Sequence, residues 1–512
     1  MCGIFGLISV KENFNSVKIF KDLYLLSETR GKEASGFAVN NKNELRVFKT
    51  PVSASQMVQG RLFKEEMAKI FKEQNRHFRG IGHSRLVTDG HEQFDDNNQP
   101  VVKNGMAVIH NGIIVNQHEL WKEFDSTLKI SELDSELIPT IIDDQLNKGK
   151  SLGEAINIFY GMIYGMTNIA LLFTKYNNLV LATNNGSIYY IFDKESEFFT
   201  FASEKQILSK LCKKNKIEKF LTKITQLKPR KIGSLNFVDF DFEKVRFGQK
   251  INNLSNNSNP LTLIQLNDNA KIRQEYINVS LDHSVDDVKK EYIEEYERRK
   301  FSIDNLRRCT KCILPETFPF IEFDEHGVCN YCNGYHKIEY KGYDIFQKDI
   351  SKFRKKNQEP ECLLPFSGGR DSSYVLHFVV KELGLKPIAF SYDWGMITDL
   401  ARRNQARMCG KLGVEHILIS ADIRKKRKNI QKNVAAWLKR PDLGTIPLFM
   451  AGDKQYFYHA NRLMNENNIR LSILGENLLE TTNFKTGFCG VKPTFTKGHT
   501  YSLKTQDKIR MM

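Results

Sequence analysis

The sequence predicts a multidomain protein of the mixed α/β class. Its 512 residues correspond to two to four domains at about 100–200 residues per domain. Two features indicate the class: short apolar runs separated by glycines in the first half, and a later strand–glycine loop–helix–strand pattern. Four clustered cysteines mark where a new unit begins, at about residue 306. Hydrophobic residues make up 41% and charged residues 27% of the chain, which excludes collagen, wholesale disorder and a disulfide miniprotein.

Composition and charge also indicate which binding partners and which cellular compartment to expect. The net charge of +16 favours phosphate-bearing partners, such as nucleotides, nucleotide-sugars or RNA, without choosing among them. The longest uncharged stretch, 159–174, contains Thr, Asn and two Gly, so it predicts a helix end, a turn and a strand and no membrane span. The start lacks the basic region of a signal peptide. Nine cysteines, four of them clustered, indicate a reducing compartment, and we expect a cytoplasmic protein.

The first 240 residues are predicted to form a layered sheet domain. The runs MAVIHNGIIVN (106–116), TNIALLF (167–173) and NLVLAT (178–183) have the length and composition of strands. Glycines between such runs mark turns. We therefore expect this domain to cover residues 2–240.

Residues 241–305 are polar and are expected to form a linker. Within them, INNLSNNSNP (251–260) has five Asn and a final Pro, which indicates a loop. The segment 285–300 predicts a charged helix with Val288, Tyr292 and Tyr296 on one stripe.

Cys2 is the candidate nucleophile of the first domain. If the initiator Met is removed, the Cys2 thiol stands beside a free α-amino group that can act as its general base. A cysteine at this position taken alone is most often accidental. It is followed, in order, by RGKEASGF (30–37), GHSRLVTDG (82–90), NNQP (97–100), HNGIIVN (110–116), LDSE (133–136) and FASEKQIL (201–208).

Together with MCGIFG at the start, these segments resemble class II glutamine amidotransferase domains over about 230 residues. The resemblance implies an N-terminal-nucleophile (Ntn) hydrolase fold, a four-layer αββα sandwich, and L-glutamine as substrate. A cysteine nucleophile in such a site needs an oxyanion hole for the charge that develops in the transition state. The implied residues are Cys2 as nucleophile, Asn111 and the Gly112 N–H as oxyanion hole, Arg85 for the glutamine α-carboxylate, Asp134 for its α-ammonium group, and Thr88 as a further glutamine contact.

Four cysteines in CTKC (309–312) and CNYC (329–332) have the spacing C-x2-C-x16-C-x2-C. Each CxxC turn can place two thiolates on one tetrahedral ion, so the spacing indicates a zinc knuckle over residues 306–335. Four ligands leave no open position, and we therefore expect structural Zn²⁺. An iron–sulfur cluster or unmetallated thiols are the alternatives. The expected ligands are Cys309, Cys312, Cys329 and Cys332.

The loop SGGRDSS (367–373) lies between an apolar strand and a helix, and the following strand completes a βαβ unit with a parallel sheet. It is not a Walker A sequence. Glycines let backbone amides approach a phosphate, serines offer hydroxyl groups, and Asp371 can organise Mg²⁺ or cap the helix. An ordinary capped strand–helix connection is the alternative.

This loop resembles the PP-loop of ATP-pyrophosphatases. The resemblance implies a doubly wound parallel α/β domain, adenine nucleotide alpha hydrolase-like, over residues 336–512, which cleaves ATP between its α and β phosphates. Two further strand ends are expected at the same crevice. The expected ATP-site residues are Ser367, Gly368, Gly369, Asp371, Ser372 and Ser373 in the loop and Asp393, Gly475 and Glu476 at those strand ends.

The cysteine cluster followed by the glycine-rich loop, over about 306–490, resembles N-acetyl sugar amidotransferases of surface-polysaccharide biosynthesis. That resemblance implies a nucleotide-linked acetamido sugar as acceptor. ATP adenylylates its amide oxygen, ammonia from glutamine attacks, AMP leaves, and an acetamidino sugar results. Fusion to a glutaminase domain gives an asparagine-synthetase-like organisation in which ammonia can pass internally.

Two other functions stay open: an asparagine-synthetase-like enzyme with a carboxylate acceptor, and an RNA-modifying PP-loop protein. The stretch 424–440 has eight basic residues and no acidic one, which predicts a solvated helix or a surface for phosphates or RNA. The sequence has no RNP-type aromatic motif, which argues against nucleic acid. The chain ends about 140 residues after the loop. We therefore expect a minimal synthetase domain or one completed by a partner chain, and a homo-oligomer is also open.

Overall fold

The computed structural model describes residues 2–10, 14–41, 43–73, 77–87, 90–124, 129–266, 285–337, 339–355, 359–439, 441, 453–476, 483–488, 492–493 and 495. The chain forms two compact units. The first contains Met1–Arg273, Phe353–Ile423 and Lys454–Gly475, and the second contains Gln274–Lys352, Arg424–Asp453 and Glu476–Met512. No helix in these described ranges is long and apolar enough to cross a membrane.

Two large sheets form the N-terminal part of the first unit. One contains β1 (Gly3–Ser9), β2 (Ala34–Asn41), β3 (Glu44–Thr50), β4 (Phe78–Arg85), β9 (Tyr189–Asp193), β10 (Phe198–Ala202), β11 (Thr225–Gln226) and β14 (Thr262–Gln265). The other contains β5 (Val101–Lys103), β6 (Met106–Ile114), β7 (Gly165–Phe173), β8 (Asn178–Thr183), β12 (Lys231–Asn236) and β13 (Asp241–Arg246). Their strand orders are β11-β9-β10-β1-β4-β2-β3-β14 and β13-β12-β8-β7-β6-β5.

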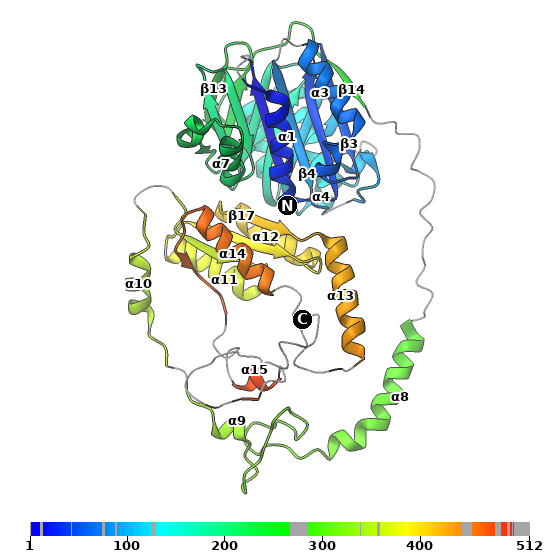
Figure 1. Ribbon diagram of the computed structural model, residues 1–512, viewed down its shortest axis with the longest axis vertical. Coiled ribbons are helices and arrows are strands. Elements are labelled where there is room, and N and C mark those ends of the chain that lie inside the picture. Colours follow the sequence, from blue (N-terminus) through cyan, green and yellow to red (C-terminus); the bar gives the residue numbers. More distant parts are fainter. Residues whose placement is uncertain are drawn as a thin grey trace. The chain divides into compact units, whose positions relative to one another are not determined.

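Helices cover the outer face of each sheet, so that the two sheets and their helices make four layers. On the first sheet lie α1 (Ser16–Ser27), α2 (Ala54–Met57), α3 (Arg61–Glu73) and α7 (Lys205–Lys214), of which α1 and α3 are seen over the strands in Figure 1. On the second lie α4 (Gln117–Glu123), α5 (Leu137–Asn147) and α6 (Leu152–Met162). This is the αββα arrangement that the resemblance implies.

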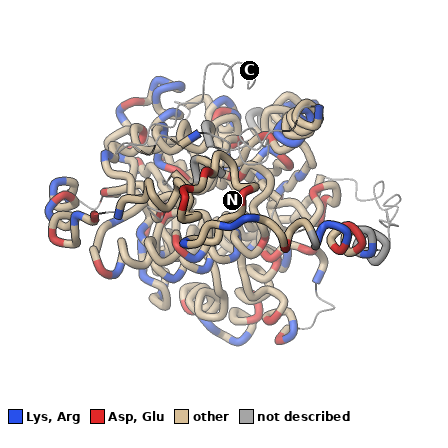
Figure 2. Tube along the Cα trace, turned by 90° about the horizontal axis from the view of Figure 1, so that it is seen from below, with Lys and Arg blue, Asp and Glu red and all other residues tan. Residues whose placement is uncertain are grey.

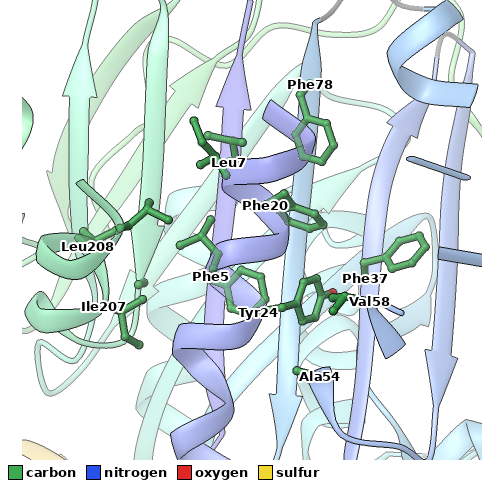
Figure 3. Close-up of a cluster of buried hydrophobic side chains, with 14 of the residues drawn as sticks. Phe5, Leu7, Phe20, Tyr24, Phe37, Ala54, Val58, Phe78, Ile207 and Leu208 are labelled. Atoms are coloured by element: carbon green, nitrogen blue, oxygen red, sulfur yellow. The ribbon is translucent and has the colours of Figure 1, made fainter. Parts of the chain in front are cut away.

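Strand β1 shows why these strands are apolar throughout. Successive side chains of a strand point to opposite faces. Phe5 packs under α1, where its ring lies 4.6 Å from that of Tyr24 (Figure 3). Ile4 points the other way, into the core between the two sheets. Both faces are therefore buried, and the strand reads as a continuous apolar run.

The predicted strands are confirmed. The runs at 106–116, 167–173 and 178–183 form β6, β7 and β8, and the stretch 159–174 contains the end of α6 and all of β7.

The sheets also continue past the expected boundary at residue 240. Strand β13 pairs with β12, and β14 pairs in parallel with β3, so part of the expected linker belongs to the sandwich. Both are edge strands that bury few side chains, which explains their polar sequences.

A smaller sheet of four parallel strands completes the first unit. It contains β15 (Cys362–Pro365), β16 (Pro387–Asp393), β17 (Glu415–Ser420) and β18 (Leu471–Ser472) in the order β17-β16-β15-β18. Its helices are α11 (Arg370–His377), α12 (Asp399–Leu412) and α14 (Asp453–Glu466). The parallel βαβ pattern is confirmed. The strand order reverses at β15, and open α/β sheets bind ligands at the carboxyl ends of the strands at such a switch point.

The second unit contains the cysteine cluster and several helices: α8 (Val285–Asp304), α9 (Asn330–Asn333), α10 (Tyr343–Ser351), α13 (Ile423–Leu438, whose first residue falls in the first unit) and α15 (Asn483–Phe488). The predicted charged helix is α8, and its stripe residues Tyr292 and Tyr296 are exposed. The basic stretch 424–440 forms most of α13, in which most described side chains are exposed. Elsewhere in the described structure, Lys and Arg are interspersed with Asp and Glu (Figure 2).

Candidate active site

Cys2 directly precedes β1 and is buried, with 6% of its surface exposed. Its Sγ lies 3.6 Å from the Leu86 carbonyl oxygen, to which the thiol donates. Burial raises the pKa of the Cys2 thiol, and the positive charge of Arg85 partly opposes that shift. Because the thiol is protonated at neutral pH, it needs a base before it can attack a substrate.

Arg85 ends β4, the strand that pairs antiparallel with β1 in the register Gly3 with Ser84. This pairing brings Arg85 beside Cys2. The Arg85 side chain is buried, and its two terminal nitrogens donate to Asn98 Oδ1 at 2.8 Å and to the Gly90 carbonyl oxygen at 2.9 Å. The guanidinium group is therefore fixed in position next to the thiol, as binding of a carboxylate requires.

Asn111 lies on β6 and is completely buried. Among the described residues, neither its Nδ2 nor its Oδ1 has a hydrogen-bond partner. An unsatisfied buried amide costs about 1–3 kcal/mol, and both polar atoms of Asn111 are available to a ligand. The Asn111 backbone is fixed, because its carbonyl oxygen accepts a 2.9 Å hydrogen bond from Asn168 Nδ2.

Gly112 follows Asn111 at a point where β6 and β7 approach closely. A Cβ added to Gly112 would lie 1.8 Å from the Met166 carbonyl oxygen. Glycine is therefore the residue that this strand pairing admits. Position 112 thus requires glycine because there is no space for a Cβ, and position 111 provides the hydrogen-bonding groups of the asparagine amide.

Asp134 begins a short 3₁₀ turn (Asp134–Glu136) and is buried. Its Oδ2 accepts from the Ile114 N–H at 2.7 Å, and its Oδ1 accepts from the Ser135 hydroxyl at 3.1 Å. Burial raises the pKa of Asp134, and these hydrogen bonds lower it. His110 Nδ1 lies 3.9 Å from Asp134 Oδ1, but burial lowers the His110 pKa to about 3, so the imidazole is neutral. A ligand ammonium group would supply the positive charge that His110 does not.

Sequence reasoning missed the side chains that hold this site together. The Gln99 side chain accepts from the backbone N–H of His110 at 2.6 Å and donates to Ser135 Oγ at 3.1 Å. Ser135 Oγ also lies 2.9 Å from His110 Nδ1. These residues belong to the segments NNQP, HNGIIVN and LDSE, so the motifs marked the segments without showing which side chains point inward. The predicted glutamine contact Thr88 lies outside the described residues.

The glycine-rich loop connects β15 to α11. Gly368 has φ +81°, and a Cβ there would lie 2.4 Å from the Ala401 carbonyl oxygen, so both conformation and space require glycine. Ser367 Oγ lies 3.0 Å from Ser372 Oγ and accepts from the Gly369 N–H at 3.2 Å. The side chain of Asp371, in the first turn of α11, is exposed. The loop thus presents hydroxyls and a carboxylate at the carboxyl end of a parallel strand, and Ser373 belongs to the first turn of α11.

The other predicted strand-end residues differ in their surroundings. Gly475 lies close to α11, because a Cβ there would be 3.6 Å from the Asp371 carbonyl oxygen. Glu476 is exposed. Asp393 is fully buried, and its carboxylate accepts from Arg402 at 2.6 Å and from the Gly395 N–H at 2.8 Å.

Arg402, which the sequence did not single out, links two parts of the first unit. Besides its ion pair with Asp393, it donates to the Val87 carbonyl oxygen at 3.1 Å. Val87 follows Leu86, whose carbonyl accepts from the Cys2 thiol. One guanidinium group therefore connects the end of β16 with the loop beside Cys2.

The four predicted metal ligands come together in the second unit. The Sγ atoms of Cys309, Cys312, Cys329 and Cys332 all lie within 4.8 Å of one another. The Cys309–Cys332 and Cys312–Cys329 Sγ distances are 3.9 and 3.6 Å. Four thiolates at about 2.3 Å from a tetrahedral Zn²⁺ would lie about 3.8 Å apart. The donor set and its spacing therefore fit one four-coordinate thiophilic ion.

Comparison with known proteins bears on the N-terminal sandwich. Residues 83–210 match the family described as "Glutamine amidotransferase domain". Glutamine--fructose-6-phosphate aminotransferase [isomerizing] of Bartonella quintana is 33% identical over 202 residues, 39% of this chain and 31% of that protein. The protein of the same name from Wigglesworthia glossinidia brevipalpis is 30% identical over 191 residues, 36% of this chain and 29% of that protein. The chain thus spans about a third of the length of these curated relatives.

Among solved structures, the glutamine phosphoribosylpyrophosphate amidotransferase of B. subtilis, complexed with ADP and GMP, aligns with a TM-score of 0.36 and 20% identity over 49% of this chain and 50% of that chain. The sequence matches, together with the geometry around Cys2, define the class: the chain contains a class II, Ntn-type glutamine amidotransferase domain and is an enzyme.

Proposed function

We propose that this protein is a glutamine-dependent, ATP-consuming amidotransferase. Ammonia released at Cys2 would convert an AMP-activated acetamido group of a sugar, carried on a nucleotide, into an acetamidino group for surface-polysaccharide biosynthesis. The observation that carries the proposal is Asn111, a fully buried amide with both polar atoms unpartnered in the described structure, next to Gly112. An oxyanion hole needs such a preorganised donor.

In the glutaminase half-reaction, Cys2 attacks the side-chain amide carbon of glutamine after Met1 is removed. The Cys2 α-amino group accepts the thiol proton and returns it to the departing ammonia. Asn111 Nδ2 and the Gly112 N–H stabilise the oxyanion, while Arg85 and Asp134 hold the α-carboxylate and the α-ammonium group. Water then hydrolyses the γ-glutamyl thioester, which releases glutamate and regenerates the thiol.

The glycine-rich loop supports the ATP-dependent half. Gly368, Gly369 and the hydroxyls of Ser367, Ser372 and Ser373 would hold the phosphates, with Gly475 and Glu476 at the neighbouring strand end. Asp371 would hold Mg²⁺, which neutralises phosphate charge. The acetamido oxygen attacks the α-phosphorus of ATP and pyrophosphate leaves; ammonia then attacks the imidate carbon and AMP leaves.

The contacts of Asp393 assign it a different task in this scheme. Because Asp393 is buried and paired with Arg402, we propose that it positions the end of β16 against the glutaminase loop. Apart from Glu476, the residues of both candidate sites belong to one compact unit, which supports transfer of ammonia within the chain. In the second unit, the four cysteines would hold a structural Zn²⁺ that takes no part in the reaction.

The test is an assay of AMP and pyrophosphate release with glutamine and Mg·ATP across a panel of acetamido nucleotide-sugars, with aspartate and bulk tRNA as controls. We expect AMP release together with a sugar product whose mass fits replacement of oxygen by NH. AMP release with aspartate alone would identify a carboxylate acceptor, and release with tRNA alone would identify an RNA-modifying enzyme; either result would contradict the proposal.

A further inference from the structure

A large cavity in the first unit belongs to neither candidate site. Its volume is about 1030 Å³, and its walls are α6, the start of β7, the turn before β12, the residue after β13 and the C-terminal end of α12. The lining residues with chemical character are three cations, Arg230, Arg407 and Lys411, and three aromatic residues, Tyr160, Tyr164 and Phe247. No described acidic residue lines it. Its size suits a small organic ligand.

The three cations make the cavity a site for an anion. All three side chains are exposed, and within the described chain none has an acidic partner. The Arg407 guanidinium instead donates to Asn404 Oδ1 at 3.1 Å, and that of Arg230 lies 6.0 Å from the centre of the Phe247 ring. Positive charges that converge without counter-charge attract phosphate groups, which guanidinium forks bind well.

The aromatic residues provide a surface for a planar group. The Tyr160 and Phe247 rings stack with their centres 4.4 Å apart, and the Tyr160 hydroxyl donates to the Thr167 carbonyl oxygen at 3.1 Å. These contacts fix that wall. Tyr164, by contrast, is 61% exposed, so its ring face is accessible for stacking.

The end of α12 provides acceptors for the polar edge of such a group. The last turn of a helix leaves carbonyl oxygens without helical partners. Here Gly410, Lys411 and Leu412 line the cavity, and the chain leaves the helix at Gly413, which has φ +66°. Carbonyl oxygens accept from the amino, imino or hydroxyl groups that bases and sugars carry.

The cavity is separate from the ATP crevice. In a parallel sheet the connecting helix runs opposite to its strands, so the C-terminal end of α12 lies at the amino ends of β16 and β17. The glycine-rich loop lies at the carboxyl end of β15, the opposite edge. None of the proposed glutaminase or ATP-site residues lines the cavity.

We propose that this cavity binds a nucleoside phosphate. Its phosphates contact Arg230, Arg407 and Lys411, and its base stacks on Tyr164. The proposal does not depend on the acceptor or on the ATP-dependent reaction.

The experiment measures binding of UDP and GDP to the full-length chain by calorimetry at low ionic strength. We expect the double variant Arg230→Ala/Arg407→Ala to weaken binding at least about ten-fold, and Arg246→Ala, an exposed arginine on β13 outside the cavity, to leave it unchanged. Asp371→Asn in the glycine-rich loop should also leave it unchanged. Because Arg230, Arg407 and Arg246 are exposed, these variants should fold, which thermal melting checks.

Uridine carries only the base and the sugar, and pyrophosphate carries only the phosphates. Binding of these two ligands therefore tests the aromatic part and the cationic part of the site separately. Tyr164→Ala should weaken UDP but not pyrophosphate. The proposal is overturned if neither UDP nor GDP binds the wild-type chain, if the double variant binds both as tightly as wild type, or if Asp371→Asn abolishes binding, since the last result would place UDP in the ATP crevice.

Discussion

At the scale of single residues, the site around Cys2 combines polar and charged groups whose burial is energetically unfavourable. The amide of Asn111 has no partner in the described structure, and Asp134 is a buried carboxylate beside a neutral imidazole. Such groups destabilise a fold unless a ligand satisfies them. Glutamine carries the complementary groups: an amide that becomes an oxyanion, an ammonium group and a carboxylate.

The unpartnered amide leads to a prediction for Asn111→Ala. Loss of an oxyanion donor typically lowers kcat by about 100–1000-fold. Because the amide makes no hydrogen bond in the described structure, its removal should leave the melting temperature unchanged or raise it. Glutaminase kinetics and thermal melting check both parts. A large drop in melting temperature with normal kcat would assign Asn111 a structural task instead.

His110 leads to a prediction of pH dependence. Burial lowers its pKa in the folded state to about 3 from an ordinary value of 6.5, so the unfolded chain binds the proton more tightly. Acid therefore favours unfolding: this contribution to stability is complete above pH 6.5 and is lost as pH falls toward 3. The free energy of unfolding should fall less steeply over that window in His110→Asn. Equal slopes for both proteins would contradict a neutral, buried imidazole.

At the scale of elements, sequence pattern was most informative where strands are buried on both faces. The apolar runs of β6, β7 and β8 predict buried strands, whereas the polar sequences of β13 and β14 predict a linker, because edge strands keep polar side chains. The same limit applies to the site. The motifs NNQP and LDSE identified segments, but the pairing of Gln99 with His110 and Ser135 depends on how β6 and the turn at Asp134 approach each other.

The cysteine knuckle gives a prediction about metal removal. Its four thiols form the centre of a small cluster with aromatic neighbours such as Tyr331 and Phe318, so an ion there would hold the segment together. Chelation with verified loss of zinc should make residues 306–335 the first site of proteolysis, while glutaminase activity persists. Unchanged protease sensitivity of the metal-free protein would argue against a structural ion.

At the scale of the whole molecule, the sequence predicted the glutamine amidotransferase domain but not the contacts that join it to the smaller parallel sheet. No sequence motif indicates the role of Arg402, because its partners, Val87 and Asp393, are far apart in the sequence. Its single side chain touches both the loop beside Cys2 and the end of β16. A bridge of this kind can tie glutamine hydrolysis to ATP use.

Arg402→Lys should loosen that coupling. Lysine keeps the charge beside buried Asp393 but lacks the planar fork that reaches two partners. We expect more glutamate formed per AMP than in the wild type, with each half-reaction still detectable. Arg246→Lys, an exposed position outside both candidate sites and outside the cavity, is the control. An unchanged ratio of glutamate to AMP in Arg402→Lys would show that the bridge does not couple the sites.

The most direct test of the central claim follows the amide nitrogen of glutamine. Glutamine labelled with ¹⁵N in its side-chain amide is supplied with Mg·ATP and the acceptor panel to wild type and to Cys2→Ala, and product mass is measured. We predict label in the wild-type product, none with Cys2→Ala, and restored turnover of Cys2→Ala with ammonium salts. Glutamate release by Cys2→Ala at the wild-type rate would contradict the assignment of Cys2 as the nucleophile.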